Sequence, residues 1–365
     1  MKIGIITYHN AINYGAVFQS YALSKYIAKL GYDVEIINYM CPAVQAQYNY
    51  KTVKDSYSLL NFFNHNITCF LHTQKKKRFA DFLSRLPLSE EISNKAYLNG
   101  NKYDIVITGS DQVFNPVCNG SDMSFFLDFA NNSKKYSYAA SMGSVESFKK
   151  LKNDPLELLK SFNGISLRED DATQYLSNCL NRRCLTVMDP VWLLSKSEWE
   201  DLAGTTRIIN KPYIFVYNLM DFKYMRDFVI HLSKTTRLPV VVANRTAIGE
   251  FQYWGKSHNA SNSSPDAFLN LLLNSDYFIT DSFHGTSLAV IMEKRVAIAL
   301  NRGEHTTNSR FSAIIEKMGL EKQIIRDNYD PFDSPIDFNF AKKQIVDDLN
   351  NSYNYLNNII QMRNI

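Results

Sequence analysis

Short β-branched runs alternate with helical patterns along this chain, and that alternation constrains the fold more than any other feature. The opening segment reads as strand, helix and strand at 2–6, 15–30 and 33–38. This order is typical of a β-α-β unit in a doubly wound parallel sheet. Further strand patterns follow at 104–108, 135–140, 165–168 and 185–188. We therefore predict a Rossmann-like N-terminal domain over residues 1–205.

The same alternation begins again after Lys211-Pro212. Strand, helix, strand, helix and strand patterns lie at 213–217, 222–234, 239–243, 265–273 and 277–280. They predict a second Rossmann-like domain over 206–335. Apolar residues at helical spacing then predict a helix within 336–365 that docks across both domains. At 365 residues the chain is longer than most domains built on a single hydrophobic core, which agrees with a division into two α/β domains.

Composition and charge exclude several classes of function. Forty basic against thirty-six acidic residues leave a net charge of +4, too mild to indicate a nucleic-acid partner. The five cysteines are scattered and form no CxxC pair, so we expect neither a disulfide framework nor a zinc site. No apolar run approaches the roughly 20 residues of a membrane span. The N-terminus also lacks the pattern of a signal peptide, and we expect a cytoplasmic protein.

Common cofactor motifs are missing. The loop after the first strand pattern, Thr7–Gly15, contains one glycine where a dinucleotide-binding fingerprint would have three. The chain also has no GxxxxGK[ST] loop and no HExxH motif. We therefore expect no cofactor and no metal site.

Residues 45–85 interrupt the alternation with an aromatic and basic stretch that includes Lys75–Arg78. One interpretation is a peripheral patch that contacts an anionic membrane. The other, which the sequence favours, is an amphipathic helix pair that covers the sheet and turns its lysines to solvent.

Polar residues gather where predicted strands end. His284 follows the strand at 277–280, and the helix beginning near Gly285 offers backbone N–H groups to an anion, with side-chain donors on Ser282 and Thr286. A histidine in that place is suited to donate or accept a proton, whereas a structural histidine bonded to a carbonyl is the alternative.

Two other strand ends carry charged side chains. Arg168 precedes an acidic helix start, and its fork can bind a carboxylate or phosphate, or form a surface salt bridge. Asp111 and Gln112 follow the strand at 104–108 and can deprotonate or hydrogen-bond a sugar hydroxyl, or cap the next helix. Ser141 marks a fourth strand end.

Several blocks together resemble one family. They are Thr7–Asn10, Asn13–Ala16 with Gln19, Gly109–Gln112 with Asn115-Pro116, Tyr138–Ser141, Leu167–Glu169, Asp189-Pro190 and Thr280–Gly285. In order and spacing the chain resembles polysaccharide pyruvyl transferases over about residues 1–320. The resemblance implies a GT-B-like architecture of two Rossmann-like domains facing a cleft, phosphoenolpyruvate as donor and no obligatory metal.

The resemblance also implies roles for matching residues. The family's histidine and arginine, which match His284 and Arg168, serve donor binding or catalysis. We expect His284 to supply or relay a proton, Arg168 to hold the donor and Asp111 to orient the acceptor. Some family members carry an arginine where this chain has Ser282. The expected donor-binding residues are Ser282, Gly285, Thr286, Arg245, His305 and Arg310, the last three as candidates to replace that arginine. The expected acceptor-binding residues are Asn10, Asn13, Tyr14, Gln112 and Ser141.

The predicted function is transfer of the enolpyruvyl unit of phosphoenolpyruvate to a sugar acceptor, lipid-linked or free, in capsule or exopolysaccharide biosynthesis. Phosphoenolpyruvate is then a co-substrate, and the enzyme works in the cytoplasm or at the inner face of the membrane. Two alternatives stay open: a GT-B glycosyltransferase that uses a nucleotide sugar, and a non-catalytic glycan-binding partner in an assembly complex.

Overall fold

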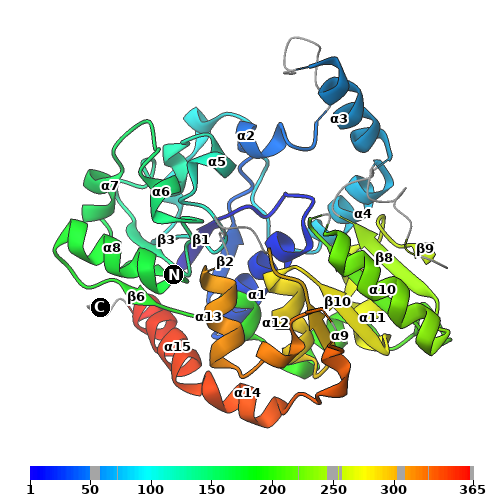
Figure 1. The fold of residues 1–365 in the computed structure, drawn as a ribbon. Coiled ribbons are helices and arrows are strands. Elements are labelled where there is room, and N and C mark those ends of the chain that lie inside the picture. Colours follow the sequence, from blue (N-terminus) through cyan, green and yellow to red (C-terminus); the bar gives the residue numbers. More distant parts are fainter. Residues whose placement is uncertain are drawn as a thin grey trace.

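Two separate parallel sheets organise the molecule (Figure 1). The computed structural model describes residues 1–49, 58–71, 73–220, 222–244, 254, 257–301, 309–327 and 329–361. The first sheet has the order β2-β1-β3-β4, formed by Asp33–Ile36, Lys2–Ile6, Ile105–Thr108 and Lys134–Ser137. The short parallel pair β5 (Ser166–Leu167) and β6 (Leu185–Thr186) continues it through the bridge between Ala140 and Leu167.

The second sheet has the order β11-β10-β7-β8-β9, and all its strands are parallel. Its strands are β7 (Ile214–Asn218), β8 (Val240–Asn244), β9 (Ser257–Asn259), β10 (Tyr277–Thr280) and β11 (Val296–Ile298). Each sheet therefore reverses its strand order once, between β1 and β3 and between β7 and β10. The predicted α/β class with two Rossmann-like, doubly wound sheets is confirmed.

Helices surround both sheets (Figure 1). In the first half they are α1 (Tyr14–Lys29), α2 (Pro42–Gln45), α3 (Leu59–Leu71), α4 (Thr73–Leu83), α5 (Pro116–Asn119), α6 (Val145–Phe148), α7 (Leu156–Lys160), α8 (Asp170–Leu180) and α9 (Lys196–Ala203). In the second half they are α10 (Lys223–Thr236), α11 (Pro265–Asn274), α12 (Phe283–Ile291), α13 (Ser309–Lys317), α14 (Phe338–Gln344) and α15 (Val346–Ile360). No helix in the described ranges is long and apolar enough to cross a membrane.

One aromatic core joins the two halves. Tyr14 of α1 is buried and stacks on Phe268 of α11, with ring centroids 4.2 Å apart. Its hydroxyl donates a hydrogen bond to the carbonyl oxygen of Ser263 at 2.8 Å. Because both rings are buried and in contact, they hold the first sheet and the second in a defined relation.

The C-terminal segment contacts both halves as two helices rather than the single helix predicted. Ala341 and Ile345 belong to the same core cluster as Phe268. Leu356 and Ile359 of α15 instead pack in the cluster of Ile3 and Ile5 from β1, as well as other residues of the first sheet. The boundaries 1–205, 206–335 and 336–365 stay predictions.

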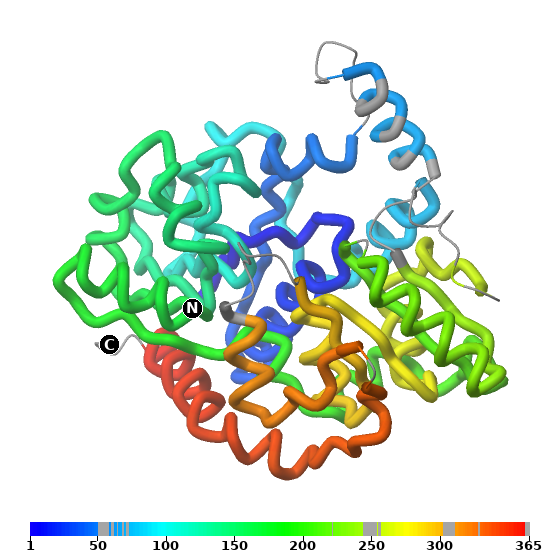
Figure 2. The backbone as a smooth tube through the Cα atoms, viewed as in Figure 1, coloured from blue at the N-terminus to red at the C-terminus, as the bar shows by residue number. Residues whose placement is uncertain are grey.

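The aromatic and basic stretch at 45–85 divides into two different helices. Phe79 and Phe82 of α4 are buried in the core, as the helix-pair interpretation predicts. In contrast, α3 projects from the body of the molecule (Figures 1 and 2), and Phe63 and Phe70 on it are exposed. The prediction that both helices cover the sheet is therefore wrong for α3.

Candidate functional site

A cavity of about 310 Å³ lies between the two halves, where both sheets reverse their strand order. This is the edge at which open α/β sheets bind ligands. The first half contributes loops after β1 and β3 and the first turn of α1, and the second half contributes the loops after β7 and β10. The residues lining it are Tyr8, Ala11, Asn13, Ala16, Val44, Gln47, Tyr48, Asp111, Gln112, Cys118, Arg168, Leu219, Asp281, Ser282, Phe283, His284 and Phe311.

A buried glutamine fixes the wall formed by the first sheet. The amide of Gln19 donates to the hydroxyl of Thr7 at 2.9 Å, and its carbonyl accepts from the backbone N–H of Ser110 at 3.1 Å. The Thr7 hydroxyl in turn donates to the carbonyl of Ser110 at 2.8 Å. These bonds join the loops after β1 and β3. The next residue, Asp111, adopts a φ of 73°, uncommon for a residue other than glycine.

Arg168 is buried among three carboxylates. Its Nη1 lies 2.7 Å from Asp189 Oδ2, its Nη2 lies 3.3 Å from Asp111 Oδ1, and its Nε lies 3.5 Å from Glu169 Oε1. Burial by itself would lower the pKa of Arg168, but the three carboxylates raise it above its usual value. The alternative of a surface salt bridge is wrong, because only 2% of this side chain is exposed.

Asp189 is the centre of this cluster, and the sequence-based site prediction did not include it. Its Oδ2 accepts from Arg168 and from His284 Nε2 at 3.2 Å, while its Oδ1 accepts from the backbone N–H of Val191 at 3.2 Å. Burial would raise the pKa of Asp189, but His284 and Arg168 lower it below its usual range. The sequence signal was present, since Asp189-Pro190 follows the strand predicted at 185–188.

His284 reaches Asp189 from the opposite half of the molecule. Ser282 caps α12, its hydroxyl accepting from the backbone N–H of Gly285 at 3.2 Å, and this places His284 in the first turn of that helix. The imidazole also lies directly on α1: a Cβ added to Gly15 would stand 2.2 Å from His284 Nδ1. Only glycine leaves room for the ring there.

The described side chains of the cavity are not strongly cationic. Asp111 and Asp281 line it together with Arg168, whose guanidinium already faces carboxylates. Two helix N-termini offset the negative charge of these carboxylates. The first turn of α1 meets the cavity at Asn13 and Ala16, and that of α12 meets it at His284. The aligned N–H groups of such turns favour an anion.

Comparison with known proteins agrees with this geometry. A sequence model described as polysaccharide pyruvyl transferase matches residues 13–303. The chain belongs to the polysaccharide pyruvyl transferase family. That match covers α1, the loop at Asp111, Arg168, Asp189 and the first turn of α12, and it confirms the resemblance seen in the sequence.

Solved structures show the same fold at low sequence identity. A putative UDP-N-acetylglucosamine 2-epimerase from Listeria monocytogenes has a TM-score of 0.51 and 9% identity, covering 96% of this chain and 88% of that one. The UDP-GlcNAc 2-epimerase of Methanocaldococcus jannaschii has a TM-score of 0.50 and 13% identity, covering 96% and 93%. These likenesses support the GT-B-like fold of this pyruvyl transferase family member and nothing about its substrate. No curated protein matches the sequence.

Some of the residues predicted for the family site line the interdomain cavity, and others do not. His284, Arg168 and Asp111 come together, and Ser282, Asn13 and Gln112 line the same cavity. The other predicted residues in the described part of the chain do not line it; they are Asn10, Tyr14, Ser141, Gly285 and Thr286.

The five residues away from the cavity have contacts elsewhere in the protein. Tyr14 is in the aromatic core, Asn10 donates to Met40 Sδ, and Ser141 donates to Glu169 Oε1 at 2.5 Å. Gly285 and Thr286 are buried inside α12. Tyr14 in particular cannot contact an acceptor, because its side chain is enclosed between the two sheets.

Three predicted donor-binding residues fall outside the described side chains. They are Arg245 and His305, which lie outside the described residues, and Arg310, whose backbone alone is described in α13. Their roles stay predictions. Within the described residues, no group of histidine, cysteine and carboxylate side chains is arranged to hold a metal ion.

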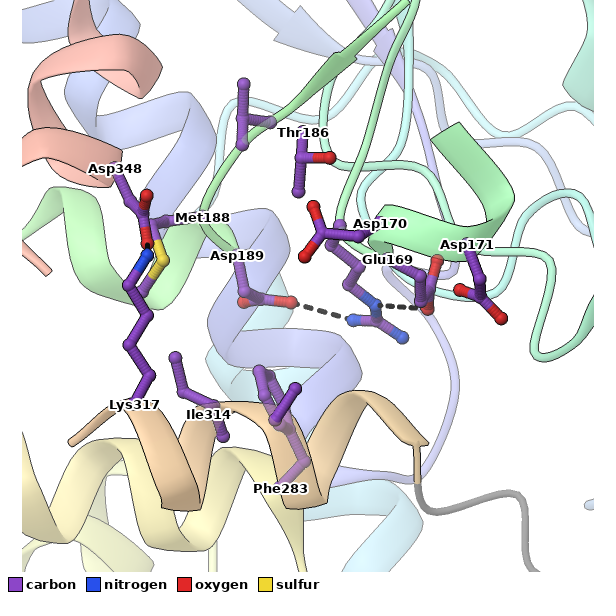
Figure 3. A pocket seen from close by; sticks show the side chains of 13 residues that line it. Glu169, Asp170, Asp171, Thr186, Met188, Asp189, Phe283, Ile314, Lys317 and Asp348 are labelled. Carbon is purple, nitrogen blue, oxygen red and sulfur yellow. Dashed lines mark hydrogen bonds and ion pairs between the residues drawn. The ribbon is translucent and has the colours of Figure 1, made fainter. Parts of the chain in front are cut away.

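Figure 3 shows a second cavity, of about 340 Å³. Its lining shares Arg168 and Phe283 with the first cavity. In Figure 3, Asp170 lies on the α8 side, across the cavity from Phe283 and Ile314. One wall thus carries carboxylates, and the other carries apolar side chains together with Lys317, which pairs with Asp348. Such a cavity suits the hydroxyls and C–H faces of a sugar better than it suits an anion.

Proposed function

We propose that this protein transfers the enolpyruvyl unit of phosphoenolpyruvate to two hydroxyls of a sugar, forming a pyruvate ketal in cell-surface polysaccharide biosynthesis. We place this activity in the cytoplasm or at the inner face of the membrane. One observation carries the proposal: in a chain of this family, His284 and Arg168 come from opposite halves and meet on Asp189 beside one cavity.

The proposed reaction balances without a cofactor. Protonation of the donor's methylene carbon makes the central carbon electrophilic, and one sugar hydroxyl adds to it. The bond to phosphate then breaks, and the second hydroxyl closes the ketal. The two hydroxyl protons balance the one gained by the new methyl group and the one gained by the released phosphate.

His284 is the proposed proton donor. Asp189 accepts a hydrogen bond from Nε2 and so orients the ring at the cavity that His284 lines, where we expect the imidazole to exchange a proton with the substrate. Asp189 is a positioning residue in this scheme, because it acts through His284. Arg168 holds Asp189 and Asp111 in place, and its remaining N–H groups are candidates for the donor's carboxylate.

Substrate placement follows from charge. The donor belongs in the interdomain cavity, where the first turns of α1 and α12 offer N–H groups to its phosphate. Arg245, His305 and Arg310 stay candidates for additional contacts. The acceptor sugar is then expected beside Asp111 and Gln112 and to extend toward the acidic second cavity. The carboxylates that line the second cavity favour neutral or amino sugars over anionic ones.

The test incubates the purified full chain with phosphoenolpyruvate and a panel of lipid-linked and free glycans. We expect phosphate release and, by mass spectrometry, a glycan with an added pyruvate ketal. His284→Ala should abolish both, while His231→Ala, which removes an exposed histidine on α10, should leave both unchanged. Unaltered turnover in His284→Ala would remove that residue from the mechanism. Release of a nucleoside diphosphate from a sugar nucleotide would favour glycosyl transfer instead.

A further inference from the structure

Helix α3 carries a stripe of apolar side chains that the described part of the chain leaves exposed. The exposed fractions are 64% for Leu59, 57% for Phe63, 49% for Ile67 and 69% for Phe70. The spacing of four, four and three residues places all of them on one face of the helix. Figures 1 and 2 show α3 projecting away from both sheets. Large aromatic residues on a projecting helix require an explanation outside the core.

Contacts on the opposite side of α3 keep this stripe turned outward. His65 Nε2 lies 2.7 Å from the carbonyl oxygen of Asn49, and Cys69 Sγ lies 3.4 Å from the carbonyl oxygen of Tyr48. His65 and Cys69 are four residues apart and therefore share a face, roughly opposite to that of Phe63 and Phe70. The helix thus rests on the segment after α2 with its polar side.

Charge indicates what the stripe contacts. Residues 56–80 contain no aspartate and no glutamate, and four consecutive bases, Lys75–Arg78, begin α4 directly after α3. Lys75 is buried, but Lys77 and Arg78 are exposed and Lys76 is half-buried. An apolar helical face next to bases, without acidic residues, is typical of helices that lie in the interface of an anionic bilayer.

We propose that α3 docks on an anionic lipid surface, with Leu59, Phe63, Ile67 and Phe70 inserted at the acyl boundary and with Lys76, Lys77 and Arg78 of α4 near the lipid headgroups. The proposal does not depend on the reaction assigned to the interdomain cavity. It brings that cavity to a membrane surface, where a lipid-linked glycan would be presented.

The test uses the full chain and two kinds of vesicles, phosphatidylcholine alone and phosphatidylcholine mixed with phosphatidylglycerol, in a flotation assay. We expect binding to the mixed vesicles and little to the neutral ones. The double variant Phe63→Gln, Phe70→Gln should weaken binding by about tenfold or more, because the apolar insertion is lost. A matched control, Tyr97→Gln with Val117→Gln, removes two side chains that are 75% and 74% exposed elsewhere and should bind like the original protein.

Several outcomes would overturn the proposal. They are failure of the original chain to float with the mixed vesicles, equal binding by the α3 variant, and a concentration-dependent dimer that the α3 variant abolishes in the absence of lipid. The last result would assign the stripe to a second copy of the chain. Circular dichroism of both double variants controls for folding, which exposed side chains should not affect.

Discussion

At the scale of single residues, the environment of His284 depends on a glycine from the other half of the molecule. Gly15 lies in the first turn of α1, and its missing side chain is what lets the imidazole approach the helix. The same histidine is held through Nε2 by Asp189. Two separate elements therefore set the position of one ring, and each can be altered without touching the ring itself.

Gly15→Ala should reduce transfer strongly while the chain stays folded. The added Cβ would lie 2.2 Å from His284 Nδ1 and would force the ring away from Asp189. Alanine is otherwise the better helix former by about 1 kcal/mol, so helix propensity does not oppose the change. Phosphate release from phosphoenolpyruvate measures the effect, with the exposed Lys25→Ala on the same helix as control. Full activity in Gly15→Ala would show that this position of the ring is not required.

Asp189→Asn should lower the free energy of unfolding by about 3 kcal/mol near neutral pH, since it leaves Arg168 and His284 without their shared carboxylate. The pKa of Asp189 lies below its ordinary value of 3.8 in the folded state. The carboxylate therefore stabilises the fold at pH values above 3.8, and this contribution is lost as the pH falls below that value.

Urea unfolding at a series of pH values measures the difference between the original chain and the variant. We expect the difference to shrink on going from about pH 6 to about pH 3. Asp81→Asn, at an exposed carboxylate on α4, is the control and should change stability little at either pH. A difference that does not depend on pH would contradict the assigned role of the charge.

At the scale of elements, α1 serves both the site and the core. Its first turn lines the cavity through Asn13 and Ala16, while Tyr14 and Phe18 pack against α9 and α11. Asn13 caps the helix by accepting from the backbone N–H of Ala16 at 3.3 Å. The helix is thus anchored in aromatic packing one residue away from the point where it meets the cavity.

Phe268→Ala should destabilise the protein by about 3–5 kcal/mol, because it removes the ring against which Tyr14 stacks and leaves a cavity in the core between the two sheets. Phe340→Ala is the matched control, since that ring is 48% exposed on α14, and a change near zero is expected. Denaturant midpoints of both variants check the prediction. Equal small effects would mean that the two halves do not depend on this contact.

At the scale of the whole molecule, the candidate site is formed by both sheets together, at the places where each sheet reverses its strand order. A ligand that binds in the cavity between the two sheets should stabilise the whole chain against unfolding. Phosphoenolpyruvate at a hundredfold excess over its Kd should add about 2.7 kcal/mol to the free energy of unfolding. Thermal unfolding with and without the donor measures this, and UDP-glucose at the same concentration is the comparison. Stabilisation by the nucleotide sugar alone would contradict the proposed donor.

Much of this architecture could be predicted, because periodicity is a local property. The helix expected at 15–30 occupies Tyr14–Lys29, and the strand expected at 277–280 is found at those residues. The approach of Asp111 to Arg168 was also predictable, since parallel strands end at one edge of their sheet. His284 comes from the second sheet, and its approach followed from the family resemblance instead. Asp189 was missed because its partners are far away in the sequence, 21 residues for Arg168 and 95 for His284.

The sequence by itself determined the order of elements, the two sheets and the strand ends that carry polar side chains, because each of these depends on neighbouring residues and on backbone geometry. Only the tertiary structure decided that Tyr14 is in the core while Asn13 faces the cavity, and that α4 is covered while α3 is not. Neighbouring residues and helices of similar character differ in burial, because different segments pack against them. These packing contacts come from segments distant in sequence, so no local sequence pattern predicts them.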